Sequence, residues 1–253
     1  MLLHMDLTLD LQKGVISSIT QKDDGESLNT NYLTPYLESL GPNFTNGANF
    51  AISGSYTLPR SVLFSLDVQI LQFRRFHNPK DFRNALYTID ISQNDLSVAF
   101  GHLSYVQVTE KVPSFISEIE DAIRSLYQQG VKNFWVYNTG PLGCLPQKFA
   151  TSSKNVSGLN PYGCLHRLNE GARVFNEKLR ALCEGLRSAM KNATIAYMDV
   201  YAIKYDLIAN SAIYGFENPL MACCGHGGLP YNYNPNIKCG QFGYEVCESL
   251  SIH

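Results

Sequence analysis

An asparagine and an aspartate follow an apolar run that is typical of a buried strand. The run covers residues 85–91, and Asn94 and Asp95 come shortly after it. The carboxyl ends of parallel strands meet along one edge of a sheet, where ligand sites form. The amide of Asn94 is neutral and directional, so it can donate to an oxygen that becomes negative during a reaction. The same pair can instead cap a helix or form an Asx turn.

A second candidate group lies about forty residues earlier, in Gly47-Ala48-Asn49-Phe50-Ala51. A glycine has no side chain, so the backbone N–H of Gly47 can approach a ligand closely. Asn49 could hold neighbouring loops through its amide, or it could be a satisfied buried amide. Gly47 could also be a turn glycine.

The elements that must position these residues alternate between strands and helices. Apolar residues recur at three- and four-residue steps over 115–126 and 165–186, which predicts amphipathic helices. Strand, helix, strand order predicts right-handed crossovers, and hence a parallel sheet with helices on both faces. From Gly215 the chain is rich in Gly, Pro, Cys and Tyr, which is typical of an irregular, cross-linked surface region. The other predicted elements are helices over 32–40 and from 66 to near 77, strands over 85–91, 133–137 and 193–200, and a strand or loop over 47–53.

Together with the runs Asn138–Pro146 and Cys223-Cys224-Gly225, these blocks resemble the plant GDSL esterase/lipase family, a branch of the SGNH hydrolases. The resemblance spans about Glu26 to Glu248. It implies a three-layer α/β/α sandwich with a mostly parallel, flavodoxin-like sheet. It also implies an oxyanion hole made by the Gly47 N–H and the Asn94 amide, with Asn49 and Asp95 in support. It also implies a small-molecule ester or acylated substrate, no cofactor, a monomer and secretion. Ser92 departs from the family's usual glycine, and a serine held at positive φ there costs about 1 kcal/mol or more.

Two family motifs do not occur in the sequence. There is no Gly-Asp-Ser for the nucleophile, and no Asp stands three residues before a His to supply the base. His226 is a weak candidate base. We therefore expect residues 1–25 to form an atypical segment, and residues 26–253 to form the hydrolase-like domain without its C-terminal catalytic block. The first central strand is then missing or replaced, and the alternating residues Leu7–Leu11 are a candidate replacement.

This pattern predicts an ester hydrolase by family whose present chain is catalytically impaired. A non-catalytic acyl- or carbohydrate-binding glycoprotein and a non-functional truncated product are the alternatives. The formal net charge is -2 and no block of like charges occurs, so nucleic acid is not an expected partner. The 45% hydrophobic content is that of an ordinary globular chain, and we expect no membrane span.

All seven cysteines lie in the second half of the chain and lack a paired C-x-x-C, so we expect no metal site. Cys144 with Cys164 and Cys224 with Cys239 are the candidate disulfides, although counting alone does not settle the pairing. Asn43, Asn155 and Asn192 begin N-glycosylation patterns. Met1–Asp6 offers no cationic and apolar leader. Cysteines and glycosylation patterns favour an incomplete product of a secreted protein over a cytosolic protein with reduced thiols.

Overall fold

The computed structural model describes residues 33–37, 44, 47–59, 64–76, 84–151, 158–237 and 239–246, and the backbone of residues 2–5. Its main sheet has the strand order β2-β3-β1-β4-β5-β6, and every neighbouring pair in it is parallel. The inner order is that of flavodoxin-like sheets, with β2 added at one edge. The strands are β1 (Leu2–Met5), β2 (Thr34–Pro35), β3 (Gly47–Asn49), β4 (Leu86–Ile89), β5 (Asn133–Tyr137) and β6 (Thr194–Met198).

The central position of the sheet is held by β1. Leu2 is paired with Gly47 of β3 on one side and with Leu86 of β4 on the other. The first central strand was expected to be missing or replaced, and in the structure Leu2–Met5 occupies this position. Leu7–Leu11, which was the candidate for this position, lies outside the described residues.

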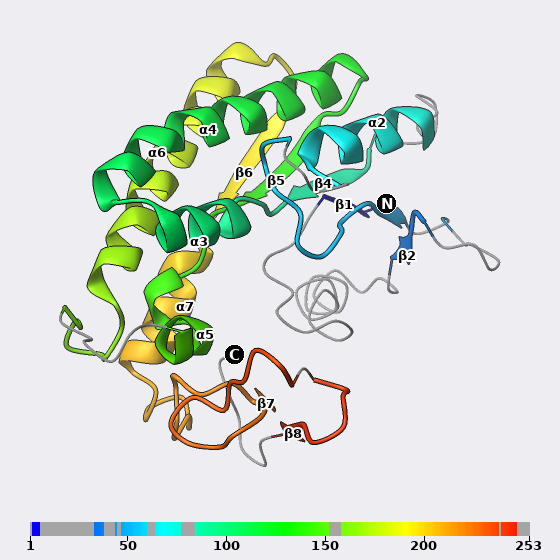
Figure 1. The fold of residues 1–253 in the computed structure, drawn as a ribbon. Helices are drawn as coiled ribbons and strands as arrows, with labels where there is room; N and C mark the ends of the chain where they lie inside the picture. Colours follow the sequence, from blue (N-terminus) through cyan, green and yellow to red (C-terminus); the bar gives the residue numbers. More distant parts are fainter. Residues whose placement is uncertain are drawn as a thin grey trace.

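Three long helices lie side by side over one face of the sheet (Figure 1). The opposite face is covered as well, because the consecutive residues Tyr87, Thr88 and Ile89 are all buried. This arrangement confirms the predicted α/β class with a parallel sheet. The three helices are α2 (Leu66–Phe76), α4 (Tyr105–Gln128) and α6 (His166–Ala189), and the shorter ones are α3 (Gln93–His102), α5 (Pro146–Thr151), α7 (Val200–Ala209) and the 3-10 turn η1 (Leu142–Cys144).

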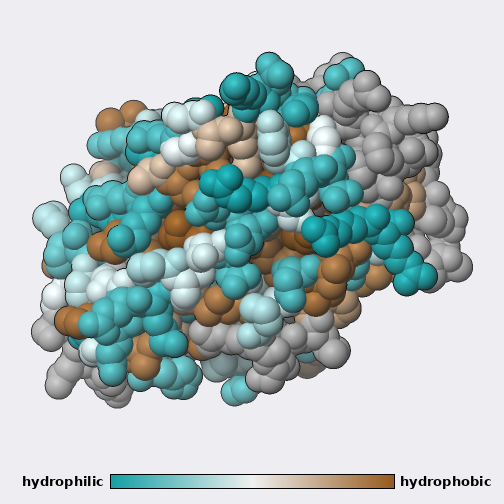
Figure 2. Space-filling view, turned by 90° about the horizontal axis from the view of Figure 1, so that it is seen from above, coloured by the Kyte–Doolittle hydropathy of each residue, from teal (hydrophilic) through white to brown (hydrophobic). Residues whose placement is uncertain are grey.

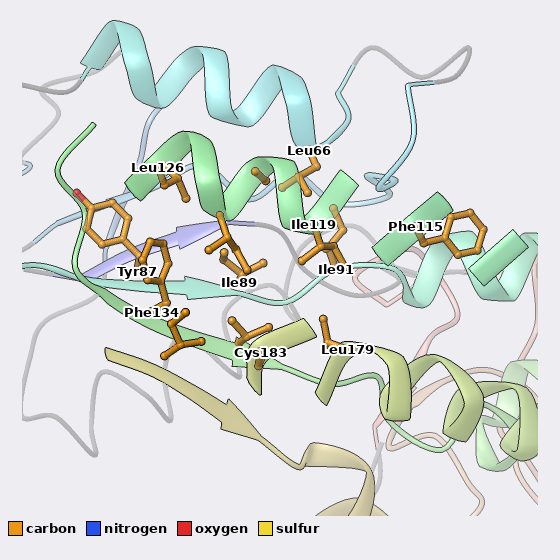
Figure 3. Packing of buried hydrophobic residues seen from close by; sticks show 14 of the residues in the cluster. Leu66, Tyr87, Ile89, Ile91, Phe115, Ile119, Leu126, Phe134, Leu179 and Cys183 are labelled. Atoms are coloured by element: carbon orange, nitrogen blue, oxygen red, sulfur yellow. The ribbon is translucent and has the colours of Figure 1, made fainter. Parts of the chain in front are cut away.

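The core lies between these helices and the central strands. Leu126 of α4 lies near Tyr87 and Ile89 of β4, and Ile119 of α4 lies beside Ile91, just past the end of β4 (Figure 3). All five side chains are buried. Each such side chain contributes about 1.5 to 3 kcal/mol by leaving water, and this packing fixes where the end of β4 lies.

The predicted helix over residues 32–40 is wrong for the part that is described. Thr34 and Pro35 form strand β2, which pairs with β3 at the edge of the sheet. Proline has no N–H to donate to a ladder, and an edge strand tolerates it for that reason. The apolar spacing suggested a helix here, but the pairing with β3 decides the conformation.

The outer surface of the helix layer is mostly hydrophilic, with apolar patches between the hydrophilic rows (Figure 2). Among the described residues, no helix is both long and apolar enough to span a bilayer. Shallow grooves of ≈ 240 and ≈ 350 Å³ lie between α2 and α4 and between α4 and α6. Neither groove is lined by a residue of the predicted oxyanion site.

Both candidate disulfides are formed, Cys144–Cys164 and Cys224–Cys239. Cys223 is also disulfide-bonded, and Cys183 is buried with a free thiol. The region after Gly215 is irregular, as predicted. Within its described residues, the regular parts are two short antiparallel strands, β7 (Cys224–Gly225) and β8 (Glu245–Val246).

Candidate oxyanion site

The site is built where β3 and β4 end, on the two sides of β1. Asn49 of β3 is level with Thr88 of β4, because both residues pair with the same residue of β1. The chain after Asn49 continues into a turn at residues 53 and 54, and the chain after Ile89 continues into α3. Asn94 is the second residue of α3, so it lies at the carboxyl edge of the sheet, as predicted.

The amide of Asn94 is held across this edge. Its Nδ2 donates to the carbonyl oxygen of Ser55 over 2.8 Å, and the side chain is buried. The bond uses one of the two amide protons and fixes the amide plane, and the second proton can serve a ligand. The positive end of the α3 dipole lies at the same place, which favours a negative oxygen there.

Behind Asn94, a buried hydrogen-bond network joins the two strand ends. The Asp95 carboxylate accepts from the Thr57 backbone N–H at 2.7 Å and from the Thr57 hydroxyl at 2.9 Å. The Thr57 hydroxyl also lies 2.7 Å from the Ser92 hydroxyl. Asp95 and Thr57 are fully buried. Asp95 is thus a structural link between the loop after β3 and the start of α3, and its position fits the predicted supporting role.

Ser92 adopts the left-handed conformation, with φ 90° and ψ -8°. Glycine reaches this conformation without strain, whereas a side chain raises its free energy by about 1 to 2 kcal/mol. Ser92 has a positive φ, so the predicted strain applies to it. The hydrogen bond between the Ser92 and Thr57 hydroxyls offsets part of that strain.

Gly47 is not brought together with Asn94. It is the first residue of β3 and pairs through β1 with the level of Leu86, at the amino end of the sheet. Three residues of strand separate that level from the end of β4, a distance of about 10 Å. The Gly47 N–H also donates to the Phe44 carbonyl at 3.2 Å. The geometry therefore does not support the oxyanion role that the resemblance implied for Gly47.

A different glycine, Gly54, lies at the correct end. It sits in the turn after β3, next to Ser55, whose carbonyl oxygen accepts the Asn94 amide. Gly54 is exposed with φ +79°, and a Cβ added to it would meet no atom within 4 Å. Among the described residues, no backbone acceptor is found for its N–H. The sequence signal was present, since Gly54 follows the apolar strand end, but only the register of β3 reveals which glycine reaches the edge.

Asn49 and His226 have local roles. The Asn49 Oδ1 accepts from the Ala51 N–H at 2.9 Å, so this buried amide shapes the chain as it leaves β3. His226 lies in the C-terminal region, where its Nδ1 is 2.6 Å from the Gly243 carbonyl oxygen.

The end of β5 is braced by a separate set of bonds. Asn138 Nδ2 donates to the Tyr197 hydroxyl at 2.9 Å and to Asp199 at 2.8 Å, and Asn138 Oδ1 accepts from the Tyr201 N–H at 2.9 Å. Burial raises the pKa of both tyrosines. The brace keeps the strand ends beside β4 rigid.

A lysine reaches α3 from the neighbouring helix α5. The Lys148 ammonium donates to the Ser97 carbonyl at 3.2 Å, and burial lowers its pKa. Ser97 lies one helical turn beyond Asn94, so a cationic group approaches the helix that carries this candidate donor.

Comparisons with known proteins find members of one hydrolase family. The family model "GDSL-like Lipase/Acylhydrolase" matches residues 17–239. The chain is 52% identical to a GDSL esterase/lipase of Arabidopsis thaliana, over 89% of this chain and 66% of that protein. It is 50% identical to GDSL esterase/lipase LIP-4 (89% and 65%) and 41% identical to Alpha-L-fucosidase 3 (85% and 65%), both of Arabidopsis thaliana.

The chain thus spans just under two thirds of the length of these relatives. A crystal structure of a GDSL-like lipase from Bacteroides thetaiotaomicron has a TM-score of 0.39 at 11% identity, covering 80% of this chain and 69% of that one. At this score the likeness adds nothing to the fold described above. The family model and the relatives show that the chain belongs to the GDSL-like lipase/acylhydrolase family.

Proposed function

We propose that this chain carries the oxyanion half of a carboxylic ester hydrolase for small-molecule esters or acylated substrates. The proposal rests on the position of the Asn94 amide, which donates a hydrogen bond to the Ser55 carbonyl at the carboxyl edge of the sheet. The second donor in the proposal is the N–H of Gly54 in the adjoining turn. Together they would donate to the oxygen of a tetrahedral intermediate.

The chemistry needs a hydroxyl nucleophile opposite these donors and a base to take its proton. The chain lacks Gly-Asp-Ser and Asp-x-x-His, the motifs that supply both groups in the family. We therefore propose that this chain on its own binds the tetrahedral anion better than it turns over esters. An oxyanion hole and binding alone leave at most about 10³ to 10⁴-fold acceleration over water.

The direct test measures two properties of the purified chain, p-nitrophenyl acetate hydrolysis and binding of ethyl hexylphosphonate, a stable tetrahedral monoanion. A hydrogen bond from an amide N–H to a charged oxygen contributes about 1.5 to 3 kcal/mol. Asn94→Ala should therefore weaken phosphonate binding at least tenfold. Any ester turnover should fall about 10² to 10³-fold with it. Asn133→Ala is the matched control, because this asparagine starts β5 at the opposite end of the sheet. Equal phosphonate affinity in wild type and Asn94→Ala would contradict the proposal.

A non-catalytic binding protein remains the second candidate, favoured by the absence of the two motifs. It predicts phosphonate or acyl-ligand binding without turnover. Covalent labelling of a serine by a fluorophosphonate probe would count against it, because such labelling requires an activated hydroxyl.

We also propose that the protein folds in an oxidising compartment as a secreted, monomeric glycoprotein. The closed pairs Cys144–Cys164 and Cys224–Cys239 support this, because such bonds persist outside the cytosol. Asn192 is exposed in the turn before β6, where a glycan has room. Asn43 and Asn155 lie outside the described residues. Mass spectrometry of secreted protein should show one glycan fewer in Asn192→Gln, and an unchanged mass apart from the substitution would refute this site.

A further inference from the structure

Ser55 connects the two proposed oxyanion donors. Its backbone N–H and its hydroxyl both donate to the Ile52 carbonyl, at 3.1 and 2.6 Å, which closes the turn that contains Gly54. Its own carbonyl oxygen accepts the Asn94 amide at 2.8 Å. A rotation of Ser55 would therefore move the Gly54 N–H and release the Asn94 amide together.

Gln69 reaches Ser55 from the helix layer. It lies on α2 and is fully buried, and its Nε2 donates to the Ser55 hydroxyl oxygen over 3.1 Å. Leu66, Ile70 and Phe73 of the same helix are buried in the core, so α2 is a fixed base for this bond. The Ser55 hydroxyl thus donates a hydrogen bond to the Ile52 carbonyl and accepts one from the Gln69 amide, which leaves it little freedom to rotate.

We propose that Gln69 is a positioning residue of the oxyanion site that acts through the Ser55 hydroxyl and sets both donors. The inference rests on the proposed function, since it assigns Gln69 a role only in that site. Small displacements matter in such sites, because a misplacement of about 1 Å can reduce a rate about 10²-fold. Gln69 itself does not touch the reacting atoms.

The direction of the hydrogen bond separates this role from simple packing. Gln69→Leu keeps the shape and removes the donor, so the Ser55 hydroxyl loses one partner. Gln69→Glu also keeps the shape, but an ionised carboxylate only accepts. It would draw the hydroxyl proton away from Ile52 and so remove one of the two hydrogen bonds that close the turn. A packing role predicts similar behaviour of Gln69→Glu and wild type at the site after correction for stability.

The test follows the side-chain amide resonances of Asn94 in the full, ligand-free chain by ¹⁵N NMR, assigned by their loss in Asn94→Asp. We expect Gln69→Leu and Ser55→Ala each to shift these resonances and to speed their exchange with solvent several-fold. The double variant should show no further change, because both substitutions remove the same hydrogen bond between Gln69 and Ser55. Asn169→Leu, which removes a buried α6 amide that accepts from the Gly143 N–H, should leave them unchanged. Gln69→Met replaces Gln69→Leu if the leucine variant melts too early.

Unchanged Asn94 resonances in Gln69→Leu, or effects of the two substitutions that add in full, would overturn the inference. Titration with ethyl hexylphosphonate separates it from the proposed function. Gln69→Leu should weaken binding several-fold in the wild-type background and by a smaller factor in the Asn94→Ala background, where only the Gly54 donor is left to be displaced. If Asn94→Ala itself has no effect, the proposed function fails. If Asn94→Ala weakens binding and Gln69→Leu does not, only the role of Gln69 fails.

Discussion

Replacement of Ser92 should reverse the usual order of alanine and glycine stability. At φ 90° any residue with a Cβ carries about 1 to 2 kcal/mol of strain, and glycine carries none. Glycine loses about 0.5 to 1 kcal/mol through its extra freedom in the unfolded chain. Both substitutions remove the buried bond to Thr57, which contributes about 1 kcal/mol. Thr57 still donates to Asp95, so its hydroxyl is not left without a partner.

These terms place Ser92→Ala about 1 kcal/mol below wild type in free energy of unfolding, and Ser92→Gly within about 0.5 kcal/mol of wild type. Urea denaturation of both variants with disulfides intact measures the difference. Ser117, exposed in the middle of α4, is the matched control, where alanine should exceed glycine by about 1 kcal/mol. An alanine variant at position 92 that is as stable as the glycine variant would refute the strain argument.

Three further outcomes follow from the packing and the thiols. A methyl on Gly143 would lie 2.1 Å from a backbone oxygen, so Gly143→Ala should lower the thermal midpoint strongly, whereas Gly185→Ala, which meets open space, should raise it or leave it unchanged. Loss of the Cys144–Cys164 bond, with a sequence separation of 20, should reduce the free energy of unfolding by about 3 kcal/mol, read from urea midpoints of the double serine variant. Burial raises the pKa of the Cys183 thiol to about 11, so the stability that this thiol contributes is present below about pH 8.5 and is lost between there and pH 11. Urea midpoints across this range, compared with Cys183→Ala, check it, and a pH dependence equal in both would contradict it.

Helices and strands could be predicted from the sequence where a regular spacing of apolar residues determines them. Phe115, Ile119, Ile123 and Leu126 lie on one helical face, and all are buried in α4. The strand over 133–137 is found with the predicted bounds. Where conformation depends on distant pairing, the sequence did not suffice. The two-residue strand β2 and the central position of β1 are decided by partners far along the chain.

The candidate site likewise contains a residue that could be predicted from the sequence and residues that could not. Asn94 could be placed because it follows a strongly apolar strand. Gly47 and Gly54 flank the same short strand, and nothing local distinguishes them. Only the alignment of β3 with β1 shows that Gly47 begins the strand and that Gly54 follows its end. Gln69 gave no signal either, since its bond to Ser55 spans two elements.

The central place of β1 has a consequence for synthesis on the ribosome. Leu2 pairs with Leu86 of β4, so 84 residues of chain must be made after it before that ladder can begin. At about 5 to 20 residues per second, the delay is roughly 4 to 17 s. Until β3 is made, the nascent strand has both hydrogen-bonding edges open to solvent and to chaperones, and the edge that faces β4 stays open for the whole interval. By contrast, β6, the last strand of the main sheet, docks onto an existing neighbour as soon as it emerges.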